Sequence, residues 1–127
     1  MATSQGVKLI SRVAGSAITV YRLLTQAADG AVDMVADATE KPLGVSAETV
    51  ASGGTVPVAI PNGSVVKLEA GAAIAVGAEC EAAGDATGRV ITHTTGVGDY
   101  TVGTALTAAG AAGDVISVQL LVDRDQA

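Results

Sequence analysis

Apolar and polar residues alternate along several short stretches of the chain. From position 116 to 122 every second residue is isoleucine, valine or leucine, and polar Ser117 and Gln119 stand between them. An alternation with a period of two predicts a β-strand that buries one face and exposes the other to water. A loop of alanine and glycine precedes this run. Residues 99–122 are therefore predicted to form a strand, a small-residue loop and a second strand.

Residues 42–60 repeat the order of the unit at 99–122. In both, an apolar residue and a glycine precede a small-residue loop, a second glycine and an alternating strand. Gly44 corresponds to Gly103, and Gly54 corresponds to Gly113. The copy at 99–122 then has one inserted residue before its second strand. Upstream, residues 30–32 precede the first copy as residues 88–90 precede the second. This shared order favours an internal duplication of a β unit, although a chain so rich in alanine, glycine and valine also produces such matches by chance. Two copies of this length do not make a solenoid.

Turn residues divide the remainder of the chain into further strands. We predict strands at 17–25, 31–36, 64–70, 71–76 and 89–93. Cys80 is expected to point inward between two exposed glutamates. Short strands separated by Gly, Pro and Asp turns predict an all-β fold, a small single-domain barrel or sandwich of the tulip-like kind with short hairpins. At most one short helix is expected, in residues 47–52 or 106–112.

The length of 127 residues favours one domain with short extensions. Residues 1–14 are predicted to be an N-terminal arm, residues 15–123 the β-rich domain and residues 124–127 a C-terminal tail. In the arm, Val7 and Leu9 are expected to face one way and Lys8 and Arg12 the other. Gly15 is expected to end the arm.

Bulky side chains are scarce in this chain. Hydrophobic residues make up 49 %, but phenylalanine and tryptophan are absent, and Tyr21 and Tyr100 are the only aromatic residues. A core of such small side chains buries little area per residue, so contacts with neighbouring chains are expected to add buried surface. Because Cys80 is alone, no disulfide is expected. No signal peptide or membrane-spanning stretch is recognised, which predicts a protein made in a reducing cytoplasm without a membrane partner.

Charge is distributed unevenly along the chain, whose formal net charge is −6. Residues 1–28 contain Lys8, Arg12 and Arg22 and no acidic residue, whereas the other four basic residues and all 13 acidic residues lie after position 28. The basic leading segment can dock on an acidic surface, or pair with its own body or with a sister subunit. An acidic body with so few aromatic residues argues against nucleic acid as a partner.

Candidate catalytic and metal-binding residues are few. His93 is the only histidine and lacks recognisable partners for a Ser/His/Asp site. With Cys80 it would supply only two of the four ligands that structural zinc takes. The acidic residues between positions 29 and 40 do not have the spacing of an EF-hand loop and are expected to form a solvated face. No catalytic residue, cofactor or metal is therefore predicted, and the chain is not expected to be an enzyme.

Two glycine-rich segments, residues 52–54 and 110–113, invite comparison with phosphate-binding loops. A Walker loop needs a lysine and a serine or threonine directly after its last glycine, at the start of a helix. Here Gly54 is followed by Thr55 and Gly113 by Asp114, whose charge would repel phosphate. Nucleotide binding is therefore not expected.

Four runs of the sequence carry a family resemblance. They are PLGVSAETVASGGTVPVAI at 42–60, VVKLEAGAAIAVGAEC at 65–80, GRVIT at 88–92 and the closing unit at 99–122. In this order they resemble the capsid cement, or head decoration, family of tailed phages, of the DUF2190 type. The resemblance covers residues 15–122. Members often carry a RecA/RadA-like recombinase label, which the missing phosphate loop does not support here.

The resemblance implies a small β-rich protein, made in the host cytoplasm, that binds the outer surface of the mature phage head. Such proteins usually sit as homotrimers at three-fold and quasi-three-fold sites, where they bridge subunits of the major capsid protein and stabilise the shell. The partners implied are the major capsid protein and the chain itself. Together with the basic leading segment, this suggests an interface, with the capsid or a neighbouring subunit, at Val7, Lys8, Leu9, Ile10 and Arg12.

Two other functions stay open at this point. One is a different virion accessory, such as a fibre base or a tail component, which would be present in far fewer copies than the major capsid protein. The other is a small ligand-binding or enzymatic β-barrel, which would need a closed polar pocket around His93 or Cys80.

Overall fold

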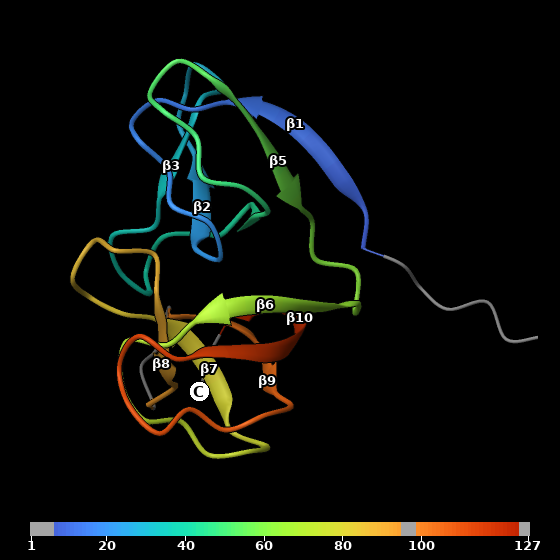
Figure 1. Cartoon of the computed structure of the whole chain (residues 1–127), viewed down its shortest axis with the longest axis vertical. Helices are drawn as coiled ribbons and strands as arrows, with labels where there is room; N and C mark the ends of the chain where they lie inside the picture. The colour runs from blue at the N-terminus through green and yellow to red at the C-terminus, as the bar shows by residue number, and fades with distance from the viewer. Residues whose placement is uncertain (1–6, 95–98, 125–127) are drawn as a thin grey trace, which may run out of the picture.

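A computed structural model describes residues 7–94 and 99–124, and within them it contains ten strands and no helix. The strands form two five-stranded antiparallel sheets, one above the other in Figure 1. The first sheet contains β1 (Leu9–Val13), β2 (Leu23–Gln26), β3 (Val32–Met34), β4 (Gly44–Ser46) and β5 (Thr55–Ala59). The second contains β6 (Val65–Glu69), β7 (Glu79–Ala82), β8 (Val90–Thr92), β9 (Tyr100–Ala105) and β10 (Val115–Arg124). The predicted all-β class is confirmed. The sheets do not close into barrels, so of the two predicted forms the structure is sandwich-like.

The two sheets have the same topology. The strand order is β1-β5-β4-β2-β3 in the N-terminal half, residues 7–60, and β6-β10-β9-β7-β8 in the C-terminal half, residues 61–124. Each strand of the first half thus has a counterpart five strands later. An isolated parallel bridge between Ala14 and Val32 recurs between Ala70 and Val90. This agreement confirms the internal duplication that the sequence suggested.

The structure corrects one detail of the repeat. Gly44 and Gly103 are equivalent, because a Cβ atom at either position would collide with a carbonyl oxygen of the neighbouring strand. The counterpart of Gly113, however, is Gly53 rather than Gly54. Gly53 donates a hydrogen bond to the carbonyl of Ala14, as Gly113 does to that of Ala70. The extra residue of the second copy therefore lies within its loop, before the second glycine.

Segments 17–22 and 71–76, predicted to be strand, are instead the same irregular connection in each half. With their flanking residues, at 15–22 and 71–78, both contain a bend, one isolated bridge and a turn before the next strand begins. The bridges join Ile18 to Val50 and Ile74 to Ala109. Ile18 and Ile74 are buried although neither lies in a strand, and a pattern of β-favouring residues does not distinguish such a connection from strand pairing.

The predicted N-terminal arm is a paired strand where the structure describes it. β1 pairs with β5 from Leu9 opposite Ala59 to Val13 opposite Thr55. Leu9 and Arg12 lie on opposite faces, as expected, because Leu9 is exposed and Arg12 is half-buried. Residues 1–6 of the arm, and residues 125–127 of the predicted tail, lie outside the described residues.

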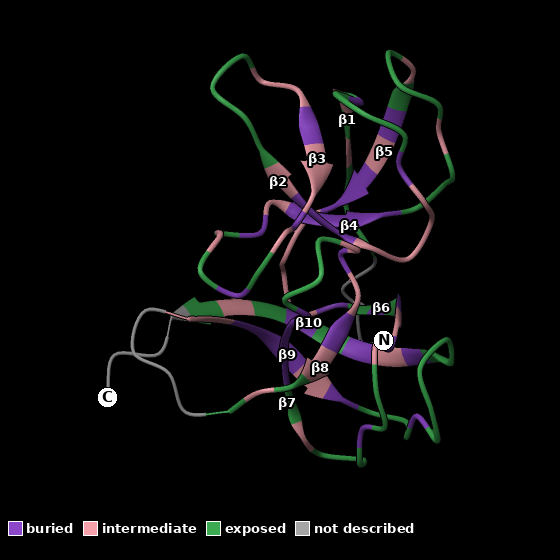
Figure 2. Cartoon of the chain, turned by 90° about the vertical axis from the view of Figure 1, so that its left-hand side faces the viewer, coloured by how far each residue is buried: buried purple, intermediate pink, exposed green. Residues whose placement is uncertain are grey.

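Two hydrophobic clusters form the core, and the larger one joins the two halves. The smaller lies inside the curled N-terminal sheet and includes Leu24, Val56 and Val58. The larger fills the C-terminal sheet and also takes in side chains from the outer face of the N-terminal sheet, among them Leu23 and Val45. Figure 2 shows buried residues in both halves. Because the halves share this core, they pack as one body.

Backbone hydrogen bonds also cross the junction between the halves. Leu23 N donates to Gly88 O at 2.7 Å, and Gly88 N donates to Val35 O at 3.2 Å. Gly88 has a φ of 71°, and a Cβ atom there would lie 2.8 Å from the carbonyl oxygen of Leu23. Only glycine accommodates both the left-handed backbone and this close approach.

Candidate docking surface

β1 and β6 are free edge strands on the part of the chain that the structure describes. Each is the first strand in the order of its sheet, with β5 or β10 as its one partner. An edge strand leaves a row of backbone groups unpaired and is a natural site for contact with another chain. Exposed aliphatic residues line these edges, since Val7, Leu9 and Val65 are 46 %, 52 % and 50 % exposed.

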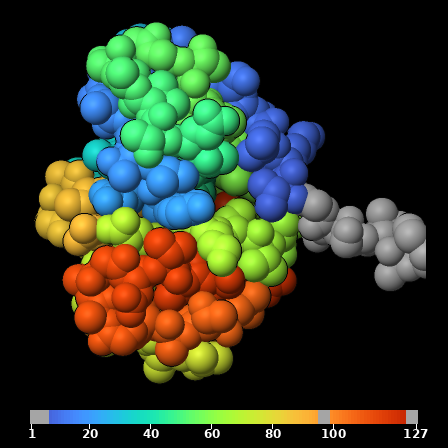
Figure 3. Space-filling view, in the orientation of Figure 1, coloured from blue at the N-terminus to red at the C-terminus, as the bar shows by residue number. Residues whose placement is uncertain are grey.

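A groove of about 230 Å³ runs between the two edges. Its lining includes Val7 and Leu9 from the first half, and Val65 and Lys67 from the second. In Figure 3 the dark blue residues of β1 lie directly beside the yellow-green residues around β6. The two edges thus form one continuous surface, to which both halves contribute.

Tyr21 lines this groove in a strained backbone conformation. Its φ is 64°, in the left-handed region, and its counterpart in the second half is Gly77 with a φ of 87°. The equivalence follows from hydrogen bonding, because Tyr21 N donates to Ser46 O as Gly77 N does to Ala105 O. A left-handed backbone costs a residue with a side chain about 1–2 kcal/mol. The carbonyl of Tyr21 also accepts a 3.0 Å bond from Glu69 N of β6, which helps to hold the conformation.

Beside the groove, one carboxylate pairs with two arginines across the junction. Glu69 Oε2 lies 3.2 Å from Arg22 Nη2 and 2.7 Å from Arg89 Nε. Arg22 also donates through Nη1 to the carbonyl of Thr87 at 2.8 Å. Of the three cations of the leading segment, Arg22 therefore pairs with its own body. Lys8 and Arg12 form no ion pair within residues 7–94 and 99–124.

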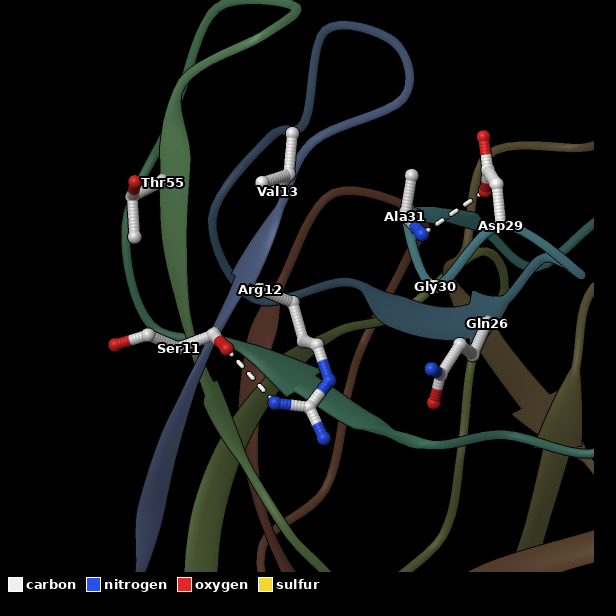
Figure 4. Close-up of a pocket in the computed structure, with 8 residues that line it drawn as sticks. All are labelled: Ser11, Arg12, Val13, Gln26, Asp29, Gly30, Ala31 and Thr55. Atoms are coloured by element: carbon white, nitrogen blue, oxygen red, sulfur yellow. Dashed lines mark hydrogen bonds between the residues drawn. The ribbon is translucent and has the colours of Figure 1, made fainter.

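Arg12 lines a separate hollow of about 620 Å³, between β1 and the turn that joins β2 to β3. In Figure 4 its side chain extends from β1 on the side of Gln26 and away from Thr55. Arg12 Nη1 donates to the Ser11 carbonyl, and Asp29 in the turn accepts from Ala31 N. The hollow is open to solvent, and its charged side chains, Arg12 and Asp29, each form a hydrogen bond with the backbone of a residue one or two positions away.

The five residues predicted as an interface are thus divided among three environments. Val7 and Leu9 line the groove, and Lys8 stands exposed between them. Ile10 packs against the N-terminal cluster, and Arg12 lines the other hollow. Sequence reasoning missed Tyr21 and Val65 as members of the groove. The sequence signal that could have found them is the duplication, which aligns Val65 with Leu9 and Tyr21 with a turn glycine.

The residues weighed for catalysis also have clear environments. His93 Nδ1 lies 2.5 Å from Glu81 Oε1, and both side chains are nearly buried. Glu81 was expected to be exposed, but the register of β7 with β9 shifts between Cys80 and Glu81, so that both residues are buried. Burial, together with the charge of Glu79, raises the pKa of the Cys80 thiol to about 11, so this thiol is protonated at neutral pH.

Three of the acidic residues between 29 and 40, Asp29, Asp37 and Glu40, are used in local turns, whereas Asp33 of β3 accepts a hydrogen bond from the hydroxyl of Ser16 at 2.7 Å. Asp37 accepts hydrogen bonds from the side chain and backbone of Thr39, which lower the pKa of its carboxyl group. Glu40 accepts from Ala36 N at 2.5 Å. No group of three metal-ligating side chains occurs among the described residues. Over the same part of the chain, no helix has the length and hydropathy needed to cross a membrane.

Comparisons with known proteins agree with this architecture. A family model described as phage cement protein matches residues 13–120. Among solved structures, the head fiber gp8.5 N base of bacteriophage phi29 is similar, with a TM-score of 0.71 and 20 % sequence identity over 96 % of this chain and 98 % of that one. At this identity the likeness concerns the fold. None of the curated proteins matches the chain.

Proposed function

This chain belongs to the phage cement protein family, and we propose that it binds the outer surface of the mature head and stabilises the capsid. The observation that carries the proposal is the extent of the family match. Residues 13–120 run from the end of β1 into β10 and so include both halves of the duplicated fold. The chain is a structural protein of the virion.

We further propose that it docks as a homotrimer at three-fold and quasi-three-fold sites, bridging subunits of the major capsid protein. Two features support association with neighbours. The core is built from small side chains, and the free edges of β1 and β6 carry aliphatic residues about half exposed. Both are typical of a chain that buries more surface on assembly.

A structural rather than enzymatic role also suits the side chains. The buried Cys80 thiol is protonated at neutral pH and is a poor nucleophile. The imidazole of His93 is held by Glu81 in a nearly buried pair. The groove between β1 and β6 has an apolar lining that contains neither residue.

The capsid would be stabilised by mass action. A subunit that binds only the expanded lattice lowers the free energy of that lattice by an amount that grows with occupancy and affinity. Many weak sites acting together then resist the internal pressure of packaged DNA. In this proposal Lys8, Arg12 and Ile10 of the predicted interface contribute to the contact surfaces around β1.

The test is co-sedimentation of the purified protein with expanded, undecorated heads. The protein is titrated to saturation, bound copies per major capsid subunit are counted, and survival of the heads on heating is recorded. We expect about one copy per capsid subunit and a higher melting temperature of the decorated heads. No binding would refute the proposal. A handful of copies per particle would instead favour a fibre base, the part named in the phi29 structure.

A further inference from the structure

Arg12 lies in a hollow at which the two edges of the N-terminal sheet approach each other. β1 and β3 are the end strands of that sheet, and on the described part of the chain an isolated bridge between Ala14 and Val32 joins the two edges. Beside this bridge the sheet is open, and the hollow of about 620 Å³ lies in the opening. We define the Arg12 hollow by the polar lining residues that matter below: Ser11, Arg12, Gln26 and Asp29.

The second half of the chain has buried apolar residues at the positions of Arg12 and Gln26. The parallel bridge that each half forms just after its first strand aligns Arg12 with Leu68. The pairing of β2 with β3, and of β7 with β8, aligns Gln26 with Ala82. Leu68 and Ala82 are 0 % and 2 % exposed and belong to the larger core cluster. The duplicated fold therefore accepts a leucine at the position of Arg12, whereas the first half has a cation and an amide there, beside an open hollow.

The guanidinium group of Arg12 has unused hydrogen-bond donors. Within residues 7–94 and 99–124 its one hydrogen bond runs from Nη1 to the carbonyl oxygen of Ser11 at 2.8 Å. In the same part of the chain Arg12 and Asp29 form no ion pair, although both line the hollow. Figure 4 shows the guanidinium group on the side of Gln26. Because a guanidinium group has five N–H donors, most of those of Arg12 remain available to a ligand.

A carboxylate is the ligand that suits this cation. The planar guanidinium group binds a carboxylate through two parallel hydrogen bonds. Asp29 Oδ1 accepts from Ala31 N at 3.0 Å, so a negative charge is already fixed in the lining of the hollow. This charge disfavours a phosphate group, which carries more negative charge than a carboxylate does. The amide of Gln26 supplies a further donor and acceptor.

The backbone of Ser11 adds a donor for an extended peptide. Across the ladder to β5, Lys8 O accepts from Ile60 N, and Ala14 N donates to Gly54 O. Hydrogen bonding alternates along an antiparallel pair, so the N–H group of Ser11 points away from β5, at the free edge of the sheet. An extended segment that brings a carboxylate to Arg12 therefore meets an unpaired strand edge beside it.

We infer that the Arg12 hollow binds the carboxylate of an acidic side chain on a partner protein. The inference rests on the proposed function and names a site through which the region of β1 contacts its neighbour. Arg12 pairs with the carboxylate, and Gln26 and the N–H group of Ser11 bind polar groups of the segment that carries it. Such a carboxylate comes from the major capsid protein or from a second copy of this chain, and the second experiment below distinguishes these sources.

The first experiment compares the affinities of two variants for expanded heads. Arg12→Leu gives the first half the residue that the second half has, so its melting temperature should not fall. Its head binding should weaken about tenfold or more, because the partner carboxylate loses its counter-charge. The control is Lys41→Leu, which removes one positive charge at an exposed position outside the hollow and should change the affinity by no more than about twofold. Equal affinities of the two variants would overturn the inference.

The second experiment identifies the carboxylate. Arg12→Lys keeps the positive charge and supplies an amine, which a water-soluble carbodiimide joins to a carboxylate in contact with it as an amide. An equal mixture of isotope-labelled and unlabelled chains is treated on saturated heads, and crosslinked peptides are identified by mass spectrometry. We expect a crosslink from position 12 to an acidic residue of the major capsid protein or of a differently labelled copy, and that peptide names the source. Coupling to Asp29 of the same chain alone, or no coupling from position 12, would contradict the inference.

Head binding by the wild-type protein distinguishes failure of this inference from failure of the proposed function. If the wild-type protein does not bind heads, the proposed function fails. If it binds to saturation and Arg12→Leu binds as tightly, the function stands and the assigned site is wrong.

Discussion

Arg22 Nη2 and Glu69 Oε2 lie 3.2 Å apart and connect the two halves of the chain. Arg22 precedes β2 in the first half, and Glu69 ends β6 in the second. Arg89 approaches the same carboxylate, so one anion balances two cations in a largely buried position. Arg22 Nε has no hydrogen-bond partner within the described residues. The buried charge of Arg22 is therefore compensated mainly by the carboxylate of Glu69.

Replacing Glu69 by glutamine should therefore destabilise the fold. The substitution leaves two partly buried guanidinium groups without their counter-charge, at an expected cost of about 2 kcal/mol, reduced from the value for fully buried pairs because Arg89 is partly exposed. Urea denaturation measures the change. Glu48→Gln, at an exposed position, is the control and should change stability by less than about 0.5 kcal/mol. Equal stability of the two variants would contradict the structural role of the cluster.

Gly88→Ala should also lower stability, and more than a comparable change elsewhere. The new methyl group would meet the carbonyl oxygen of Leu23 at the junction, in a left-handed backbone. The expected loss is about 2–3 kcal/mol from strain and displacement. Gly53→Ala is the matched control, because Gly53 also has a positive φ but has no atom within 4 Å of the added Cβ, so about 1 kcal/mol is expected. The comparison is made by thermal and urea unfolding of both variants.

The duplication predicts how self-association could be created artificially. On the outer face of the N-terminal sheet, Leu23, Val45 and Ala59 occupy one row across β2, β4 and β5, and the C-terminal half covers them. Their counterparts on β7, β9 and β10 form the equivalent row and are polar: Glu79, Thr104 and Gln119. A polar outer face on the last unit of a repeat prevents further stacking.

We expect the triple variant Glu79→Leu, Thr104→Val, Gln119→Ala to associate end to end. It recreates the apolar row that the first half buries, so its apparent mass should rise with concentration in light scattering after gel filtration. Replacing the exposed residues Thr55, Thr92 and Thr94 by valine is the control for added hydrophobicity alone. A triple variant that behaves like this control would show that the row is not a stacking surface.

We predict that the buried thiol of Cys80 makes the fold less stable in alkaline solution. Burial raises the pKa of its thiol from 9.0 to about 11, so the unfolded chain loses this proton at lower pH than the folded chain. The contribution of Cys80 to the free energy of unfolding is constant below pH 9. It falls by about 2 kcal/mol as the pH rises from about 9 to 11. Cys80→Ala should lack this part of the decline. Urea unfolding of both proteins at several values between pH 8 and 11 measures it, and parallel curves would contradict the prediction.

The sequence alone determined the local features of this protein. A period of two between Ile116 and Leu120 is sufficient to define a strand and its buried face, because side chains alternate along any extended backbone. The shared order around Gly44 and Gly103 revealed the duplication, since both positions exclude a Cβ atom where two strands approach closely. The resemblance to cement proteins came from the same turns and strands.

Tertiary structure decided which surfaces these elements bury and which they expose. The bulge at Cys80 and Glu81 changes the facing of consecutive residues, and it arises from the pairing of β7 with β9 rather than from either sequence alone. The left-handed backbone of Tyr21 is held by hydrogen bonds to Ser46 and to Glu69, far along the chain. The groove between β1 and β6 exists because Leu9 and Val65, 56 positions apart, meet where the two halves pack. Such contacts depend on long-range packing, which residue alternation does not encode.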